Sequence, residues 1–180
     1  MALDPGPIGF RPLSRDDLPR LQRWLNTPHV LQWWDKPGPT LAEVEGKYLP
    51  RIEGRDPTDS FIIEYASRPI GYIQRYLIED YPGYAQHIGL DERAVGIDVF
   101  IGEPDLVHHG LGPALLKLFL RDHVFDRSDI ASCIIGPAIS NRGAIRAYEK
   151  AGFVYVKTAE IPGEDEPEYL MRIGRYKGTK

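Results

Sequence analysis

The 180-residue sequence predicts a single domain of the mixed α/β class. Two adjacent patterns carry this prediction. Apolar and β-branched residues alternate with other residues from Val95 to Ile101, which is typical of a strand, and apolar residues then recur at helical spacing from Leu111 to Phe125. A third observation is that no linker and no internal repeat interrupts the chain. We therefore expect one domain over residues 1–180.

Composition narrows the class of protein further. A hydrophobic content of 42% and a charged content of 27% are typical of a globular domain, and no apolar run is long enough to span a membrane. The first ten residues show no signal-peptide pattern, and the single cysteine, Cys133, excludes an internal disulfide framework, so a cytoplasmic location is expected. A net charge of −4 argues against a nucleic-acid partner and allows a cationic small-molecule ligand.

The N-terminal half is expected to begin with one strand and to continue with helices and a hairpin. Capping-box sequences at residues 14–17 and 40–43 predict two helix starts, because a side chain there can accept the first unpaired N–H groups of a helix. The aromatic stretch 30–34 suggests a further short helix. The expected elements are strand 8–13, helix 18–25, helix 30–34, helix 40–49, and an antiparallel hairpin of strands 60–65 and 70–78.

The C-terminal half is expected to begin with a long loop. Residues 80–93 are polar and contain Pro82, Gly83 and Gly89, so we predict a loop there, long enough to suggest a functional role. The elements expected after it are strand 95–101, helix 111–125, strand 131–135, helix 141–151 ending at Gly152, and a hairpin of strands 153–161 and 168–173. The acid-rich segment 164–168 is expected to be a solvated hairpin tip.

A glycine-rich turn, Gly110-Leu111-Gly112, separates the predicted strand from the predicted helix. The first N–H groups of a helix lack internal partners and attract phosphate, and glycine lets the phosphate approach the backbone. Pro113 fits the first turn of a helix, where its missing N–H is not needed. The sequence contains no GxxxxGK[ST] and no GxGxxG after an early strand, which excludes the P-loop and the Rossmann fingerprint. A plain strand-to-helix turn stays an open alternative.

The order of these elements, the glycine turn and the segment 141–153 (NRGAIRAYEKAGF) together resemble the GCN5-related N-acetyltransferase (GNAT) superfamily. Within it, the chain is similar to the aminoglycoside 6′-N-acetyltransferases through short likenesses at residues 32–34, 39–41, 48–50, 69–74 and 96–104. The resemblance covers nearly the whole chain. It implies an α/β (α+β) fold with a central mixed, mostly antiparallel twisted sheet, flanked by helices and splayed at its middle strands.

The same resemblance implies acetyl-CoA as cosubstrate, no metal, and a primary amine as acceptor. Tyr148 matches the tyrosine that protonates the departing thiolate, and Asp98 matches an acid that binds the amine or helps to deprotonate it. The residues expected to bind the cofactor are Phe100, Ile101, His109, Gly110, Leu111, Gly112, Pro113, Asn141 and Ala144. The residues expected at the acceptor are Trp33, Trp34, Gln74, Glu79, Asp80 and Asp98.

Several of these residues allow a purely structural interpretation as well. Tyr148 shares a helix face with Ile145 and would fit a packed core. Gln74 lies on a predicted strand, where a glutamine can have a purely structural role and form hydrogen bonds with its neighbours. Trp33 and Trp34 are consistent with core positions, and we expect one of them to pack in the core and the other to line a pocket.

Two positions depart from the pattern of the family. Val107 stands where the superfamily usually has Gln or Arg, three residues before the first turn glycine. Gly136-Pro137 stands where many aminoglycoside enzymes have Asp-Pro, so one acidic contact to the antibiotic is expected to be missing.

The sequence therefore predicts transfer of an acetyl group from acetyl-CoA to a primary amine of an aminoglycoside, the 6′-amine being expected, which is an antibiotic-resistance activity. One alternative is an enzyme of the same fold that acts on a protein N-terminus, a polyamine or a siderophore precursor. Another is a non-catalytic acyl-CoA-binding sensor. The expected partner is a small cationic amine, with no nucleic acid and no membrane, and the protein itself is expected to be a monomer or a homodimer.

Overall fold

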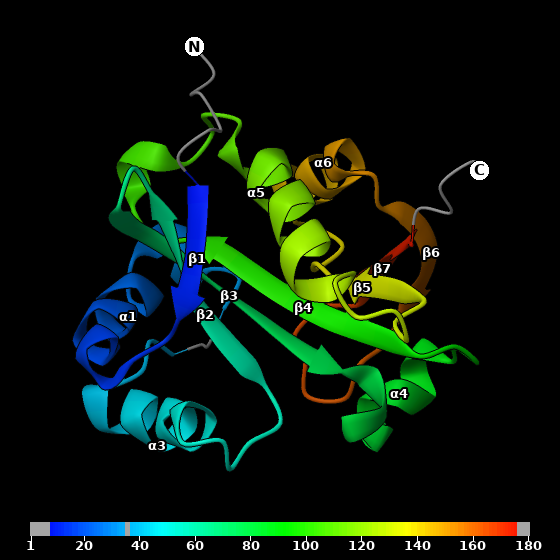
Figure 1. Cartoon of the computed structure of the whole chain (residues 1–180), viewed down its shortest axis with the longest axis horizontal. Coiled ribbons are helices and arrows are strands. Elements are labelled where there is room, and N and C mark those ends of the chain that lie inside the picture. The colour runs from blue at the N-terminus through cyan, green and yellow to red at the C-terminus, as the bar shows by residue number, and fades with distance from the viewer. Residues whose placement is uncertain (1–7, 35–36, 176–180) are drawn as a thin grey trace. The chain divides into compact units, whose positions relative to one another are not determined.

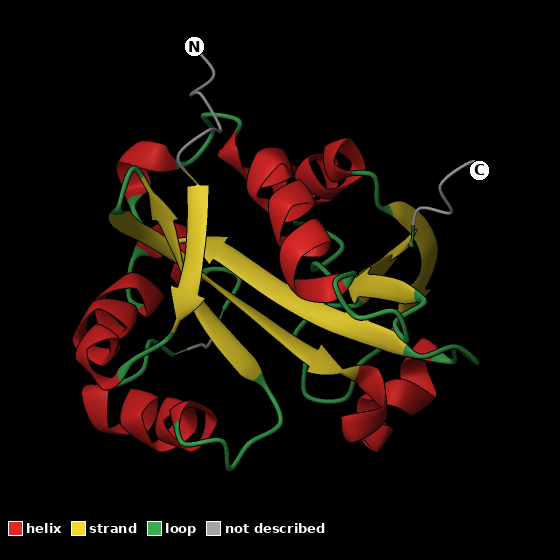
Figure 2. Cartoon of the chain, viewed as in Figure 1, coloured by secondary structure: helices red, strands yellow, loops and turns green. Residues whose placement is uncertain are grey.

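The computed structural model describes residues 8–34 and 37–175 (Figure 1). The first seven residues, which belong to the segment without a signal-peptide pattern, lie outside the described residues. In the described part of the chain the strands form one mixed sheet with the order β1-β2-β3-β4-β5-β7-β6, accompanied by helices (Figure 2). This arrangement confirms the predicted fold class. Within the ranges described, no helix has the length and the apolar character needed to cross a membrane.

The chain divides into two compact units, residues Met1–Arg75 with Asp98–Leu111 (unit 1) and Tyr76–Ile97 with Gly112–Lys180 (unit 2). The elements of unit 1 are β1 (Ile8–Pro12), α1 (Leu18–Leu25), α2 (Pro28–Leu31), α3 (Leu41–Ile52), β2 (Asp59–Tyr65) and the 3₁₀ turns Arg15–Asp17 and Pro104–Leu106. Strand β3 (Arg68–Leu77) lies mostly in unit 1, and β4 (Ala94–Ile101) begins in unit 2 and ends in unit 1. The antiparallel pairing of β1 with β2 and of β2 with β3 agrees with the predicted hairpin.

The first helical segment of unit 1 begins at the predicted capping sequence. Both the backbone N–H and the hydroxyl of Ser14 donate to Asp17 Oδ2, at 3.0 and 2.7 Å, and Arg11 donates two further hydrogen bonds to the same carboxylate. Burial alone would raise the pKa of Asp17, but these hydrogen bonds outweigh it and lower the pKa to about 2. The carboxylate therefore stays ionised and holds β1 to the start of α1.

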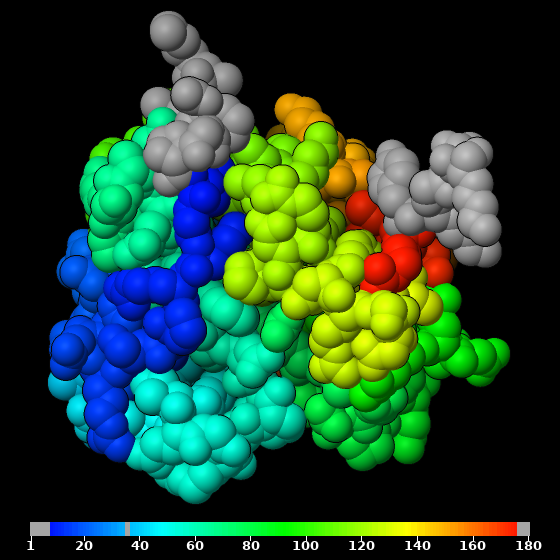
Figure 3. All heavy atoms as spheres, viewed as in Figure 1, coloured from blue at the N-terminus to red at the C-terminus, as the bar shows by residue number. Residues whose placement is uncertain are grey.

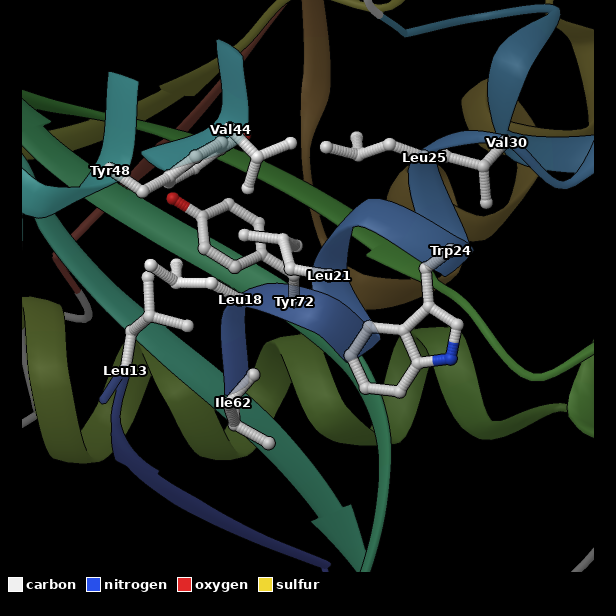
Figure 4. Close-up of a cluster of buried hydrophobic side chains, with 10 residues drawn as sticks. All are labelled: Leu13, Leu18, Leu21, Trp24, Leu25, Val30, Val44, Tyr48, Ile62 and Tyr72. Atoms are coloured by element: carbon white, nitrogen blue, oxygen red, sulfur yellow. The ribbon is translucent and has the colours of Figure 1, made fainter. Parts of the chain in front are cut away.

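The core of unit 1 forms between α1, α3 and strands β2 and β3 (Figure 4). Leu21, Trp24 and Leu25 of α1 are fully buried, as the helical spacing predicted, and Tyr48 of α3 is buried as well. The space-filling view shows the side chains of α1 (blue) against those of α3 (cyan) (Figure 3). Each fully buried side chain of this size contributes roughly 1.5–3 kcal/mol of transfer free energy, so this cluster is the main stabilising element of unit 1.

Unit 2 combines a parallel strand pair with an antiparallel hairpin. Its elements are a 3₁₀ turn (Ile78–Asp80), α4 (Pro82–Ile88), α5 (Leu111–Phe119, its first residue in unit 1), a π-helical turn (Leu120–Val124), β5 (Ser132–Ile135), α6 (Arg142–Ala151), β6 (Val154–Ala159) and β7 (Glu168–Gly174). Strand β4 pairs in parallel with β5 as far as Gly96 and Ile134, and β7 pairs antiparallel with both β5 and β6. The final hairpin is thus confirmed.

The predicted loop over residues 80–93 is wrong, because this segment contains the helix α4. Pro82 is the first residue of α4, where proline is tolerated, and Gly89 ends it with a φ of 64°. Ile88 is buried in the core of unit 2, and Tyr84 and Ala85 pack against that core. Proline and glycine in this segment therefore mark the two ends of a short helix.

Candidate active site

Asp98 lies in the part of β4 that belongs to unit 1, and its side chain is half-buried. The amide nitrogen Nε2 of Gln74 donates a hydrogen bond to Asp98 Oδ2 at 2.8 Å. A carboxylate in a strand needs such a partner, since burying an unpaired one is costly. The structure thus brings together two residues that the sequence assigned to the acceptor, and the donor that faces the carboxylate is a neutral amide.

The two neighbouring tryptophans differ in burial. Trp34 is half-buried and packs edge-on against Phe100, with ring centroids 4.9 Å apart, whereas Trp33 is 41% exposed. One tryptophan therefore packs against the core, as expected, and the other is exposed. The position of Trp33 at a pocket stays a prediction.

Phe100 and Ile101, expected beside the cofactor, take part in packing within unit 1. The ring of Phe100 stacks on Tyr72 with centroids 5.7 Å apart, and the Phe100 carbonyl lies so close to Gly71 that a Cβ at position 71 would clash with it. The carbonyl oxygen of Ile101 lies 2.9 Å from Nε2 of His29. The contact of Phe100 and Ile101 with the cofactor stays a prediction.

Glu79 and Asp80 form the 3₁₀ turn before α4, in unit 2. Both are exposed. Nη2 of Arg93 lies 2.9 Å from Glu79 Oε1, so the charge of Glu79 is balanced by an arginine at the surface. The structure does not bring either residue together with Asp98 within one unit, and their role at the acceptor stays a prediction.

The turn before α5 contains two residues in the left-handed region of backbone conformation. His108 and Gly110 adopt positive φ angles of 65° and 79°, and His109 and Gly110 are exposed. Leu111 is buried, so only its backbone takes part in the turn, and Pro113 lies in the first turn of the helix. A glycine at positive φ directly before a helix start is compatible with an anion at the first N–H groups of the helix, and the binding of the cofactor pyrophosphate by this turn stays a prediction.

Helix α6 carries the remaining cofactor residues and Tyr148. The side chain of Asn141 caps the helix by accepting a hydrogen bond from the backbone N–H of Ala144 at 3.1 Å. Tyr148 is half-buried, with its ring centroid 6.3 Å from that of Phe153, whereas Ile145 on the same helix face is buried. The contact of Asn141 with the cofactor and the role of Tyr148 as general acid stay predictions.

Position 136 lacks an acid of its own, and an acidic side chain from β7 occupies the adjacent space. A Cβ at Gly136 would clash with Glu168 Oε2, which also accepts a hydrogen bond from the Tyr84 hydroxyl at 2.8 Å. Glu164 and Asp165 are exposed as expected. The expectation of a solvated segment is wrong for Glu168, because the missing side chain at Gly136 makes room for its carboxylate.

Arg51 and Tyr72 are polar residues beside Asp98 and Gln74 that the sequence did not single out. Arg51 Nη1 donates to Gln74 Oε1 at 2.6 Å, and the Tyr72 hydroxyl donates to the same oxygen at 2.8 Å. The alternation of β3 places Tyr72 and Gln74 on one face, which was a usable signal. Nothing in the sequence around Arg51 indicates that its guanidinium is buried.

Across the described ranges, no three His, Cys, Asp or Glu side chains gather in a way that could hold a metal ion. Cys133 is fully buried.

Comparison with known proteins agrees with this geometry. A family model described as an acetyltransferase (GNAT) domain matches residues 14–161. The chain belongs to this family, and it is an acetyl-CoA-dependent N-acetyltransferase.

Its relatives include aminoglycoside N(6′)-acetyltransferase type 1 of Klebsiella pneumoniae and of Serratia marcescens, each 32% identical over 167 residues, or 91% of this chain and 81% of the relative. Among solved structures, AAC(6′)-Ib in complex with paromomycin and acetyl-CoA superimposes with a TM-score of 0.79 at 30% identity, covering 93% of both chains. AAC(6′)-Ib with coenzyme A and kanamycin gives a TM-score of 0.78 at 30% identity, covering 93% of this chain and 95% of the other.

Proposed function

We propose that the protein acetylates primary amines of aminoglycosides, with the 6′-amine as the position of transfer. The observation that carries this proposal is the likeness over 91% of the chain to aminoglycoside N(6′)-acetyltransferases. The half-buried carboxylate of Asp98 supports it, because a polycationic acceptor needs an anionic group to hold its ammonium. Acetyl-CoA is the cosubstrate, and its thioester supplies the activated acetyl group.

The proposed chemistry is direct transfer. Asp98 binds the acceptor ammonium and accepts one proton from it, so that the amine lone pair can attack the thioester carbonyl. The N–C bond forms, the C–S bond breaks, and the nitrogen loses its second proton to solvent, from which Tyr148 is reprotonated. Tyr148 donates the phenolic proton to the departing thiolate. The turn around Gly110 and the start of α5 hold the pyrophosphate through backbone N–H groups.

The proposal is tested with a matched pair of acceptors. Neomycin carries a 6′-amine where paromomycin carries a hydroxyl, and the two molecules are otherwise the same. With purified protein and acetyl-CoA, we expect release of free CoA with neomycin, kanamycin and tobramycin, and a much slower release with paromomycin. Equal rates on the matched pair would refute the 6′ position. Turnover of polyamines or N-terminal peptides with no turnover of any aminoglycoside would refute the aminoglycoside acceptor.

The role of Tyr148 has its own test. Tyr148→Phe removes the proton and keeps the ring, so kcat is expected to fall by about 10²-fold while the KM for acetyl-CoA changes little. A loss of less than about threefold under conditions where chemistry limits the rate would show that Tyr148 only packs against Phe153.

A further inference from the structure

The side-chain amide of Gln74 is held in one orientation from both of its ends. Its nitrogen donates to Asp98 Oδ2 at 2.8 Å, and its oxygen accepts from Arg51 Nη1 at 2.6 Å and from the Tyr72 hydroxyl at 2.8 Å. A reversed amide would set its NH₂ group against the guanidinium and its oxygen against the carboxylate. Both of those contacts would be repulsive, so the partners determine the orientation.

The hydroxyl group of Tyr72 uses its one proton in a hydrogen bond to Gln74. The Tyr72 hydroxyl has one proton, which it donates to Gln74, so the hydroxyl of Ser60, 2.7 Å away, must be the donor in its contact with Tyr72. Tyr72 is fully buried, and burial raises the pKa of its phenol well above the usual range. The phenol therefore remains a donor at every pH at which the protein is studied. A chain of hydrogen bonds thus runs from Ser60 through Tyr72 and Gln74 to Asp98.

Arg51 is a charged group placed deep beside a packed aromatic core. Its side chain is 11% exposed, and its guanidinium lies 5.0 Å from the ring centroid of Tyr48. Burial would lower the pKa of Arg51, but attraction to the Tyr72 oxygen and other groups raises it by more, so the side chain stays charged. The Nε of Arg51 lies 3.8 Å from Asp56 Oδ1, so a carboxylate in unit 1 partly balances the charge, while Nη1 of the same guanidinium is directed at Gln74.

We propose that Arg51 and Tyr72 are positioning residues for acetyl transfer: they lock the Gln74 amide so that its NH₂ group directs the Asp98 carboxylate toward the acceptor amine. The inference rests on the proposed function of Asp98. The guanidinium also polarises the Gln74 carbonyl, which strengthens the N–H···O bond at the far end of the amide. The Asp98 carboxylate is thereby oriented by a neutral amide, and the Arg51 guanidinium contacts the other end of that amide.

The test compares variants of the network with a variant of the neighbouring residue on β3. Arg51→Met, Tyr72→Phe and Gln74→Glu each remove one part of the network and keep the approximate side-chain volume. Arg75→Met is the control, because Arg75 follows Gln74 on the strand, points to the opposite face and pairs with Asp59 at 3.0 Å. The readouts are the KM of the aminoglycoside, the KM of acetyl-CoA and kcat, each measured at 25 °C on folded protein.

We expect Arg51→Met and Gln74→Glu to raise the KM of the aminoglycoside about tenfold and Tyr72→Phe about threefold, with the KM of acetyl-CoA within about twofold of wild type. Arg75→Met should change neither value. Arg51→Lys, which keeps the charge but not the fork of donors, should recover part of the loss caused by Arg51→Met.

Equal changes in both KM values, or no difference between the network variants and Arg75→Met, would overturn the proposal. If Arg51→Met fails to fold, Tyr72→Phe and Gln74→Glu decide the outcome alone. Failure of the proposed function is recognised separately, because the wild-type protein would then acetylate no aminoglycoside. In that event, crystal structures of the wild type and Tyr72→Phe still decide: a changed Asp98 rotamer in the variant supports the network, and an unchanged one refutes it.

Discussion

Two carboxylates in unit 1, Asp98 on β4 and Glu103 just after it, have opposite surroundings. Glu103 is 11% exposed in its side chain and is surrounded by strong donors: Oε1 accepts from Trp24 Nε1 and Arg23 Nη2, both at 2.8 Å, and Oε2 accepts from Arg68 Nη2 at 2.9 Å. Asp98 receives its hydrogen bond from the neutral amide of Gln74. Two arginines neutralise Glu103, whereas the hydrogen bond from Gln74 to Asp98 comes from a neutral donor.

This difference suits Glu103 to a structural role and Asp98 to the binding of a ligand. A carboxylate paired with two guanidinium groups ties α1, β3 and the end of β4 together and has no charge left to attract a ligand. A carboxylate oriented by an amide can still bind an ammonium group. The following predictions test whether substitution of Glu103 lowers stability and substitution of Asp98 lowers activity.

The largest effect is expected from Glu103→Gln, and it is an effect on stability. The substitution removes the charge, sets an NH₂ group against arginine donors and leaves the Trp24 indole N–H with a weaker acceptor. Because the two arginines are about half exposed, the cost is less than that of a fully buried pair, about 2 kcal/mol of unfolding free energy. Urea denaturation would measure this loss, and kcat/KM of the folded variant should stay within about twofold of wild type.

The same residue predicts a dependence of stability on pH. Burial would raise the pKa of Glu103, but hydrogen bonds from Trp24 and Arg23 outweigh it, so the folded-state pKa lies below the ordinary value of 4.5. A lowered pKa contributes stability that is fully present above 4.5 and is lost as pH falls through the folded-state value. The difference in unfolding free energy between wild type and Glu103→Gln should therefore be constant above about pH 5.5 and shrink at lower pH. A difference that grows on acidification would contradict this assignment.

Asp98→Asn is expected to lower the activity and not the stability of the protein. The isosteric amide keeps the strand intact but removes the charge that holds the acceptor, so kcat/KM for the aminoglycoside should fall about tenfold or more, with the KM for acetyl-CoA nearly unchanged. Since the wild-type interaction is electrostatic, the KM of the aminoglycoside should also rise with salt concentration more steeply for wild type than for the variant. A variant that loses stability as Glu103→Gln does, but keeps its efficiency, would abolish the distinction between the two carboxylates.

The sequence predicted the parts of the molecule whose signals are local. Helix α3 and the 3₁₀ turn before α1 begin with capping boxes, and α1 and α3 each have an apolar face. Strand β4 and helix α5 show a clear change of period, so these elements were predicted near their observed starts. Helix α4 was missed because it is only seven residues long with a single buried residue, Ile88, and because Pro82 and Gly89 were interpreted as loop residues when they mark its two ends. The resemblance to a family singled out Asp98 and Gln74. Arg51 could not be found, because its contact with Gln74 joins a helix to a strand 23 residues away.

The smallest effect is expected from Arg68→Gln, which removes one of the two guanidinium groups at Glu103. Arg68 is 50% exposed and also pairs with Asp105 at 2.9 Å, and Arg23 remains on the other oxygen of Glu103. An exposed ion pair contributes little to stability, so the unfolding free energy should fall by clearly less than it does in Glu103→Gln, as measured by urea denaturation. The matched change Arg23→Gln should cost a similar amount. If Arg68→Gln or Arg23→Gln alone lowered the unfolding free energy as much as Glu103→Gln does, a single ion pair would account for the stabilisation. The prediction that both arginines contribute would then be wrong.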